Sequence, residues 1–264
     1  MSEALISMSG LDLAITCSGS LTIHKSRERG EYAETGTRWH SAMEAYSLGA
    51  RWEDVRARAP QEVDDEHLGA MLKAFQEILH NYRLGPIKGL PMAEVTMGLS
   101  PKDKMVRLMG AGLGRRYDAG PGEIPGTGDF VFEDQNGIPL YLDLKTGNPR
   151  YGKQPAQAWQ VKAMCSALWL ATGAGQAGVY GALWYPREGM KDEPLAYGTT
   201  LRMCHFQVDA LNTYCQELGL WYMYAAMVKA GQVEPEFVRG EHCKMCDARP
   251  NCPLWRTNDA ISET

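Results

Sequence analysis

The chain has 264 residues, a formal net charge of −5 and a hydrophobic fraction of 44%. This length fits one large domain, and no apolar run reaches the roughly 20 residues that a membrane helix needs. Residues 1–10 lack the basic start and apolar stretch of a secretory signal, so a cytoplasmic location is the default expectation. The acidic balance argues against a protein that coats nucleic acid, but it allows an enzyme that grips a few phosphates in one cleft.

Hydrophobic spacing and turn residues divide the chain into helices and strands. Residues 1–35 are irregular and polar, and the glycine-rich stretch 101–127 has no clear assignment. The predicted elements are, in chain order, helices at 37–48 and 66–82, strands at 92–97, 129–134 and 138–145, a helix at 155–171, strands at 178–185 and 197–206, and a helix at 208–230. This order of strands and helices predicts a mixed α/β core.

The turn of the predicted hairpin admits two registers. A two-residue loop at Asn136 and Gly137 would place Asp143 on the apolar face, which is costly for a charge. A three-residue loop, with Gly137 in the left-handed conformation, places Asp129 opposite Asp143. In that register the apolar side chains share one face, while Asp129, Asp143 and Lys145 share the other. We therefore predict the three-residue loop.

Two carboxylates and an ammonium group on one sheet face admit two explanations. The first is a solvated salt bridge on an exposed sheet. The second is a site for a hard divalent cation such as Mg²⁺, which prefers oxygen ligands from one or two carboxylates plus a substrate phosphate. A neighbouring lysine can then orient the attacking water or help to deprotonate it. The hairpin alone does not decide between the two.

The spacing of these residues resembles the signature of the PD-(D/E)XK nuclease superfamily. Asp129 follows a glycine, and thirteen residues separate it from the sequence Asp-Leu-Lys-Thr-Gly at 143–147. The Lys-Thr-Gly form resembles the RecB-like branch, whose members also have a helix with Gly-Thr, two residues and then His. Residues 36–40 of this chain read Gly-Thr-Arg-Trp-His. The branch places a glutamine on the helix after the lysine strand, where this chain has Gln160.

The resemblance implies a role for each matching residue. Lys145 would position the nucleophile, and Gln160 would support Lys145 or the DNA. The implied ligands of a Mg or Mn ion are His40, Asp129, Asp143 and the backbone carbonyl of Leu144.

Three positions fit the resemblance less well. Glu94, on the preceding strand, only weakly resembles an acid that some members use. Met164 stands where the family often has a tyrosine, four residues after the glutamine. Ser18 follows Cys17 where the family often has a proline. The last two departures do not touch the implied metal ligands.

The cysteines carry a second signal. An odd number, seven, argues against a disulfide framework in a cytoplasmic chain. Cys243, Cys246 and Cys252 form the pattern C-x2-C-x5-C, which predicts metal binding. A zinc ribbon would supply a second C-x2-C pair, which this chain lacks, so a fourth ligand must come from elsewhere. Three further cysteines lie in predicted helices or strands, where cysteine acts as a small hydrophobic residue: Cys165, Cys204 and Cys215.

Cys17 remains as the fourth ligand, with His242 as an alternative to a cysteine. One early cysteine plus a late C-x2-C-x5-C resembles the iron–sulfur nucleases of the AddAB-type and CRISPR-adaptation groups. The sequence Cys-Ser-Gly-Ser at 17–20, upstream of Gly-Thr and His40, resembles a group encoded by bacteriophages. The implied ligands of a [4Fe-4S] cluster are Cys17, Cys243, Cys246 and Cys252. Such a cluster would tie the two ends of the chain together and close a very long loop.

The expected fold is a restriction-endonuclease-like α/β core, a mixed central sheet flanked by helices, with an iron–sulfur region that joins the N- and C-terminal segments. Its expected parts are an N-terminal segment at 1–35, a nuclease core at 36–235 and an iron–sulfur segment at 236–264. The expected activity is metal-dependent hydrolysis of DNA, as an exonuclease on ends or single strands in recombination, repair or phage DNA processing. Recombination proteins are expected partners, and a membrane is not.

Two other functions stay open at this point. The chain could be a non-catalytic DNA-binding or recombination partner that keeps the fold, or a zinc-stabilised interaction module. The intact set of Asp129, Asp143 and Lys145 favours the nuclease. Four basic clusters are each either a solvated face or a phosphate contact: Lys25, Arg27 and Arg29; Arg51, Arg56 and Arg58; Arg115 and Arg116; Arg150 and Lys153. Oligomeric state, strand preference and cleavage polarity have no readable signal.

Overall fold

The computed structural model describes residues 5–23, 31–109, 117–147, 152–188, 196–197, 201–240, 242–243, 246 and 248–254. Several residues of the basic clusters lie outside these ranges: Lys25, Arg27, Arg29, Arg115, Arg116 and Arg150.

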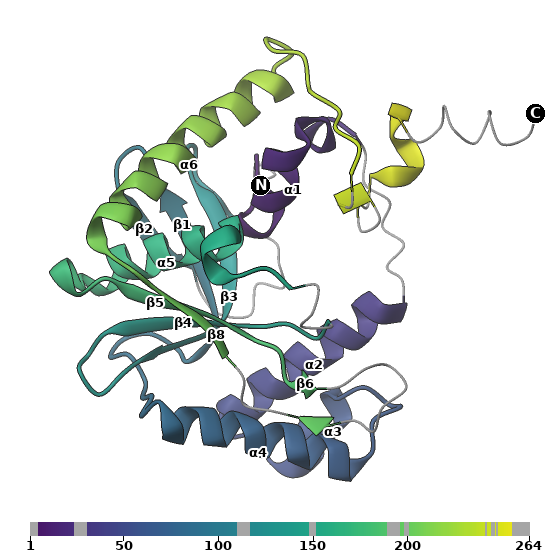
Figure 1. The fold of residues 1–264 in the computed structure, drawn as a ribbon, viewed down its shortest axis with the longest axis vertical. Coiled ribbons are helices and arrows are strands. Elements are labelled where there is room, and N and C mark those ends of the chain that lie inside the picture. The colour runs from purple at the N-terminus through teal and green to yellow at the C-terminus, as the bar shows by residue number, and fades with distance from the viewer. Residues whose placement is uncertain are drawn as a thin grey trace, which may run out of the picture.

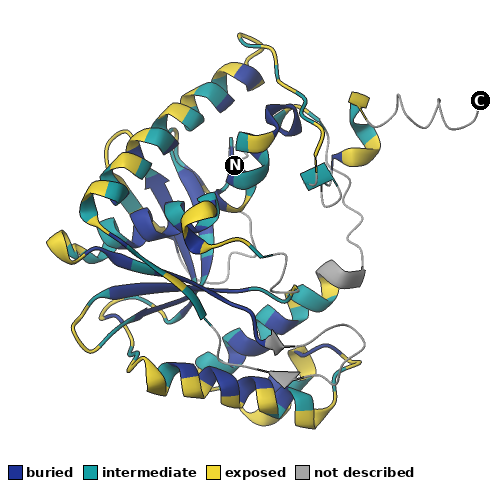
Figure 2. Cartoon of the chain, viewed as in Figure 1, coloured by how far each residue is buried: buried dark blue, intermediate teal, exposed yellow. Residues whose placement is uncertain are grey.

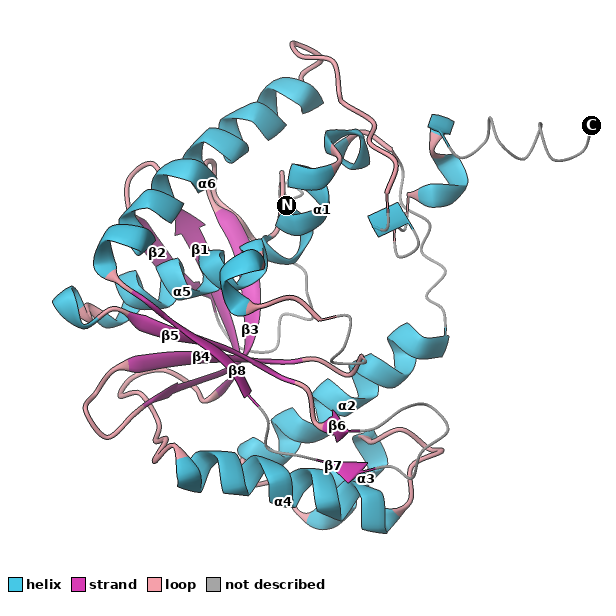
Figure 3. Cartoon of the chain, viewed as in Figure 1, coloured by secondary structure: helices cyan, strands magenta, loops and turns pink. Residues whose placement is uncertain are grey.

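A six-stranded sheet forms the centre of the fold, in the order β2-β1-β3-β4-β5-β8 (Figure 3). Neighbouring strands are antiparallel except β4 and β5, which are parallel. A parallel pair needs a crossover connection, and helix α5 (Trp159–Thr172) lies in it. The strands are β1 (Ala93–Ser100), β2 (Met105–Met109), β3 (Ile124–Glu133), β4 (Pro139–Leu144), β5 (Val179–Trp184) and β8 (Leu201–Phe206). Two short strands, β6 (Arg187–Glu188) and β7 (Ala196–Tyr197), pair separately.

Helices cover both faces of the sheet (Figure 1). On one side lie α1 (Leu11–Thr16), α5 and α6 (Val208–Lys229), and on the other lie α2 (Glu31–Ser47), α3 (Trp52–Arg58) and α4 (Asp65–Asn81). The buried side chains form two clusters, one on each face. Figure 2 shows the result, with buried strands and exposed outer faces on the helices. The prediction of a mixed sheet flanked by helices is confirmed.

Local signals explain where the long helices begin and end. Asp64 caps α4 by accepting a hydrogen bond of 2.8 Å from the backbone N–H of His67. Helix α5 ends at Gly173, whose φ of +61° is the left-handed conformation that glycine adopts without a steric penalty. None of the described helices combines the length and apolar character that a membrane crossing needs.

The hairpin between β3 and β4 has the predicted register. Phe130 pairs with Leu142, and the backbone N–H of Asp134 donates to the carbonyl of Ile138 at 3.0 Å. Three residues therefore form the loop, and Gly137 has a φ of +74°. The side chains that alternate with the two acids join the cluster under α2 and α4: Phe130, Phe132, Leu140, Leu142 and Leu144. The other face therefore carries the acids.

Two sequence-based predictions about the N-terminal third are wrong. Residues 1–35 are not irregular, because α1 forms there and buries Leu11 and Ala14 against α5. Six residues are too few to show a helical period, so only tertiary packing reveals this helix. Helix α2 begins at Glu31 rather than near residue 37, because it runs through Gly36 despite the low helix propensity of glycine.

The unassigned stretch 101–127 contains β2 and the first part of β3. Its glycines hid the strands, since glycine weakens strand propensity. One of these glycines has a packing role. A Cβ on Gly126 would lie 2.7 Å from Met8, so only glycine lets the N-terminal segment pack onto β3.

Phe75 anchors α4 to the sheet. Its side chain is 1% exposed, and its ring centroid lies 4.9 Å from that of Phe130 and 5.6 Å from that of Trp184. Phe75→Ala should lower the free energy of unfolding by about 3–5 kcal/mol, measured by urea denaturation. Leu48→Ala, at a position 60% exposed, is the control and should change it by less than about 0.5 kcal/mol. Equal losses in the two variants would contradict this assignment of the core.

Candidate active site

Two acidic side chains lie next to each other where β3 and β4 are paired. The register pairs Phe130 with Leu142, so Asp129 and Asp143 occupy the next opposed position. Their side chains point to the face that α5 covers, because side chains alternate along a strand. Asp143 is only 2% exposed and Asp129 is 14% exposed. The alternative of a solvated salt bridge on an exposed sheet is therefore wrong.

Asp129 is held from two directions. Its Oδ2 accepts a hydrogen bond of 2.8 Å from the backbone N–H of Leu144 on the neighbouring strand. Its Oδ1 lies 3.0 Å from Nδ1 of His40, in the middle of α2. The strand pairing thus fixes one oxygen of the carboxylate, and a helix from a distant part of the chain engages the other.

Asp143 contacts two neighbours on its own strand segment. Tyr141, two residues earlier on the same face, donates its hydroxyl to Oδ1 at 3.1 Å. Lys145 Nζ lies 2.6 Å from Oδ2, as an ion pair. Oδ2 is buried, and within the described part of the chain it has no partner other than this ammonium group. Such an atom is costly to bury unless something else binds it.

The four groups shift one another's protonation. Burial raises the pKa of Asp129, but the nearby His40 and Lys145 outweigh this and lower the pKa overall. Burial also raises the pKa of Asp143, and the adjacent Asp129 charge adds to the shift, so the value reaches about 6 although Lys145 opposes it. Of two neighbouring acids, one is therefore held ionised and the other is driven towards its neutral form.

Burial and the nearby carboxylates also shift the pKa values of His40 and Lys145. Burial lowers the pKa of His40, but the Asp129 carboxylate outweighs it and raises the pKa overall. For Lys145, burial likewise lowers the pKa while Asp143 raises it, and the net shift is upward. Lys145 is 36% exposed, so its ammonium group is charged and reaches the surface of the site.

Two glycines make the close approach of these elements feasible. A Cβ on Gly36 would lie 3.1 Å from Oγ1 of Thr146, so α2 packs tightly against the residue after Lys145. A Cβ on Gly128 would lie 2.6 Å from Met164 of α5 and 3.0 Å from Tyr141. A larger residue at either position would displace these neighbouring side chains.

The residues present fit a hard divalent cation. Two carboxylates stand side by side, and the buried Oδ2 of Asp143 has Lys145 as its one partner among the described residues. The pKa of Asp143 is raised, first by burial and then by the neighbouring Asp129 charge. A cation at this place would favour the ionised form of both acids. Oxygen ligands of this kind suit Mg²⁺ or Mn²⁺.

The remaining predicted site residues lie around this centre. Gln160 is half-buried in the first turn of α5, and within the described ranges its side chain makes no hydrogen bond with Lys145. Its implied support of Lys145 stays a prediction, as does the ligand role of the Leu144 carbonyl. Glu94 precedes Val95, which pairs with Gly128, so Glu94 lies at the register position opposite Asp129. Its φ of +50° is strained for a residue other than glycine.

Sequence reasoning missed Tyr141. The signal was present, since a residue two positions before Asp143 must share its face of the strand. Tyr141 is fully buried, and burial together with the Asp143 charge raises its pKa well above the usual value, so the phenol is a proton donor at neutral pH.

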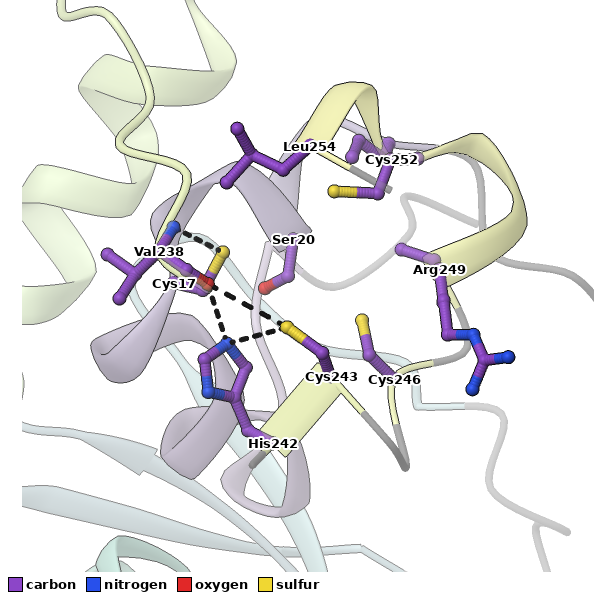
Figure 4. Close-up of a pocket in the computed structure, with 11 residues that line it drawn as sticks. Cys17, Ser20, Val238, His242, Cys243, Cys246, Arg249, Cys252 and Leu254 are labelled. Carbon is purple, nitrogen blue, oxygen red and sulfur yellow. Dashed lines mark hydrogen bonds between the residues drawn. The ribbon is translucent and has the colours of Figure 1, made fainter. Parts of the chain in front are cut away.

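The four cysteines of the second pattern line one pocket, with Cys17 on one side and Cys243, Cys246 and Cys252 on the other (Figure 4). Their sulfur atoms point towards a shared space. The backbone N–H of Val238 also donates to Cys17 Sγ at 3.5 Å. Within the described ranges, no group of three or more His, Cys, Asp or Glu side chains is arranged to hold a metal ion, so the iron–sulfur prediction stays a prediction.

The residues after Cys17 explain how the two ends of the chain meet. The backbone N–H of Gly19 donates to the carbonyl of Glu236 at 2.9 Å, and Ser18 Oγ accepts from the Glu236 N–H at 2.8 Å. A Cβ on Gly19 would lie 2.3 Å from the ring of Phe237, so only glycine fits there. His242 also lines the pocket, and its Nε2 lies 3.0 Å from the carbonyl oxygen of Val238 and 3.6 Å from Cys243 Sγ.

The raised pKa of Asp143 predicts a pH-dependent stability. An acid whose pKa rises on folding, from 3.8 to about 6, stabilises the fold fully below pH 3.8 and loses that contribution as the pH rises through about 6. In metal-free buffer, Asp143→Asn should therefore gain stability relative to the wild type across this window, by about 3 kcal/mol. Urea denaturation at several pH values measures the difference. A difference that stays constant or shrinks with rising pH would contradict the shift.

Comparisons with known proteins agree with this geometry. The family model described as "PD-(D/E)XK nuclease superfamily" matches residues 6–253. No curated protein sequence matches the chain significantly. Among solved structures, one named "Putative exonuclease" from Eubacterium rectale has 14% identity, covers 96% of this chain and 87% of its own, and has a TM-score of 0.48. The structure of SSO0001 has 16% identity, covers 94% and 96%, and has a TM-score of 0.34. Scores this low carry no weight, but the family model spans nearly the whole chain, and the chain therefore belongs to the PD-(D/E)XK nuclease superfamily.

Proposed function

We propose that the chain is a metal-dependent deoxyribonuclease that hydrolyses phosphodiester bonds at the site of Asp129, Asp143 and Lys145. One observation carries the proposal. Two acids with opposed pKa shifts stand side by side, and the Lys145 ammonium group lies 2.6 Å from the buried Oδ2 of Asp143. Clusters of perturbed acids and bases are typical of catalytic sites.

The proposed ligands of Mg²⁺ or Mn²⁺ are Asp129, Asp143, His40 and the Leu144 carbonyl. A bound cation would polarise the scissile phosphate and lower the pKa of the attacking water. The protein residues do the rest. Leu144 N–H and Tyr141 OH orient the two carboxylates at 2.8 Å and 3.1 Å, so that little reorganisation is needed when substrate arrives.

Lys145 has a separate role in this proposal. Its ammonium group is charged and reaches the surface beside Asp143. There it orients the nucleophilic water and offsets the negative charge that develops on the phosphate oxygens. Gln160, at the start of α5, supports Lys145 or the DNA strand once substrate is bound.

Lys145→Ala should reduce the rate of DNA cleavage in Mg²⁺ or Mn²⁺ by on the order of 10²–10³-fold, measured on end-labelled oligonucleotides. The matched control is Lys73→Ala on α4, a lysine whose side chain is 76% exposed and pairs with Glu77 at 3.9 Å, and it should cleave at the wild-type rate. Absence of cleavage by the wild type with either metal, or equal cleavage by Lys145→Ala, would refute the enzyme and leave a non-catalytic DNA-binding protein.

The RecB-like resemblance also supports an exonuclease that acts on DNA ends or single strands, in recombination, repair or phage DNA processing. Comparing linear DNA with covalently closed circles, each single-stranded and duplex, distinguishes this mode from an endonuclease. Cleavage of closed circles as fast as linear DNA would exclude the exonuclease mode.

We further propose that Cys17, Cys243, Cys246 and Cys252 hold a [4Fe-4S] cluster. The support is the shared pocket, into which segments from both ends of the chain bring their thiols. When bound, such a cluster would act as a covalent staple between these segments.

Protein purified without oxygen should be brown and absorb near about 400 nm, as iron–thiolate clusters do. Cys17→Ser should lower the iron content, whereas Cys204→Ser, at a cysteine of β8 that does not line the pocket, should retain it. Iron and acid-labile sulfide analysis measures both. Colourless protein with stoichiometric zinc would show instead that the pocket is a zinc site.

A further inference from the structure

A polar groove lies beside the proposed active site, on a part of α2 that catalysis does not use. Its lining comes from α2 and the last residue of α3, and consists of Glu34, Thr37, Arg38, Ser41 and Arg58. Two guanidinium groups, two hydroxyl groups and the carboxylate of Glu34 line the groove.

The groove is close to His40. Gly36 and His40 lie one helical turn apart on the side of α2 that faces the strands. Thr37 and Ser41 each follow one of these residues, so their side chains are rotated by about 100° around the helix axis. On a helix about 10–12 Å across, this rotation places the groove on the order of 10 Å from the imidazole. Consecutive phosphates of a strand are separated by several ångströms, so the groove lies within a few phosphates of the scissile one.

The two arginines are held loosely by their acidic neighbours. Arg38 Nε lies 3.8 Å from Glu34, whose side chain is 71% exposed, and a guanidinium nitrogen of Arg58 lies 3.9 Å from Glu44. Arg38 also donates to the carbonyl of Ala59 at 3.3 Å, which keeps its guanidinium over the groove.

Another arginine of the same region, Arg56, is bound tightly. Arg56 lies 2.8 Å from Asp65 and donates to the carbonyls of Pro60 and Val63. Arg56 therefore has a structural role that Arg38 and Arg58 lack. A phosphate, which accepts two parallel hydrogen bonds from a guanidinium, can replace distant carboxylate contacts of the kind seen in the groove.

We propose that Arg38 and Arg58, with the hydroxyl groups of Thr37 and Ser41, bind a backbone phosphate of the substrate strand next to the cleavage site. The inference rests on the proposed nuclease function, which defines the substrate as a phosphodiester chain. Arginine, serine and threonine are the side chains that commonly contact DNA phosphates, and such contacts fix the register of the strand without reading its sequence. The groove thus positions the strand, and the acids of β3 and β4 act on it.

The test uses the full chain with Arg38→Gln, Arg58→Gln and the double variant, since glutamine keeps most of the side-chain stem and removes the charge. Arg51→Gln is the matched control, because Arg51 precedes α3, is 82% exposed and does not line the groove. Thermal denaturation checks that each variant is folded. Binding of a fluorescein-labelled single-stranded oligonucleotide is measured in EDTA, where no cleavage occurs, over a range of salt concentrations.

Each groove variant should bind roughly five- to tenfold more weakly, and the slope of log K against log salt should fall by about 0.7 for each phosphate contact that is lost. Arg51→Gln should match the wild type. Wild-type affinity and slope in the double variant would overturn the inference, as would an equal loss in Arg51→Gln or a loss of affinity with no change in slope.

A second measurement locates the contact on the strand. Oligonucleotides that carry one uncharged methylphosphonate within a few positions of the cleaved bond should bind the wild type more weakly than the unmodified oligonucleotide. The double variant should be insensitive at those positions. Insensitivity of the wild type at every position would also overturn the inference.

The two proposals can fail separately. If the wild type cleaves no DNA but the groove variants still lose affinity and salt slope, the nuclease function fails and the phosphate contact stands. If the wild type cleaves and the groove variants keep the wild-type KM, the nuclease stands and the groove has no part in binding. The expected pattern is a raised KM with an unchanged kcat, because the contact is made equally in the ground and transition states.

Discussion

The site depends on one constraint, which is that two carboxylates are held side by side on paired strands with one of them almost fully buried. In the metal-free protein this is unfavourable, since burial and repulsion raise the pKa of Asp143 while His40 and Lys145 keep Asp129 ionised. The fold maintains the arrangement because the strand pairing, the Leu144 N–H and the Tyr141 hydroxyl over-determine it. A cation bound between the two acids would relieve this repulsion.

Helices from distant parts of the chain complete the site by approaching the strands closely. Helix α2 brings His40 to Asp129 because Gly36 leaves room for Thr146, and α5 packs over the acids because Gly128 leaves room for Met164. Asp12, in α1, accepts hydrogen bonds from the backbone N–H groups of the first two residues of α5. It also forms an ion pair with Lys153. The N-terminal segment therefore positions the helix that carries Gln160, and the same segment carries Cys17 to the pocket at the C-terminus.

Helix α2 presents different residues to the core, to the two acids and to the groove, because successive side chains point in different directions around a helix. Trp39, Ala42 and Met43 pack into the core with α4, His40 faces the acids, and Thr37, Arg38 and Ser41 line the groove. In the proposed complex, Arg38 and Arg58 would meet the DNA locally, although the chain has a net charge of −5 and Glu34, Glu44 and Glu62 lie near the two arginines. A strand held in the groove would be presented to the acids in a defined register, which strengthens substrate binding and leaves kcat unchanged.

The sequence by itself determined the hairpin, its three-residue loop and the shared face of Asp129, Asp143 and Lys145, because strand alternation and turn chemistry are local and periodic. It also indicated the family, through residues whose spacing matches a known signature. Tertiary structure alone decided that α1 forms, that α2 extends through Gly36, and that strands lie within 101–127, since packing outweighs weak propensity there. It alone decided the burial that raises the pKa of Asp143 and the meeting of Arg38 with Arg58, twenty residues apart along the chain. Burial and long-range proximity depend on every element at once, so no local pattern contains them.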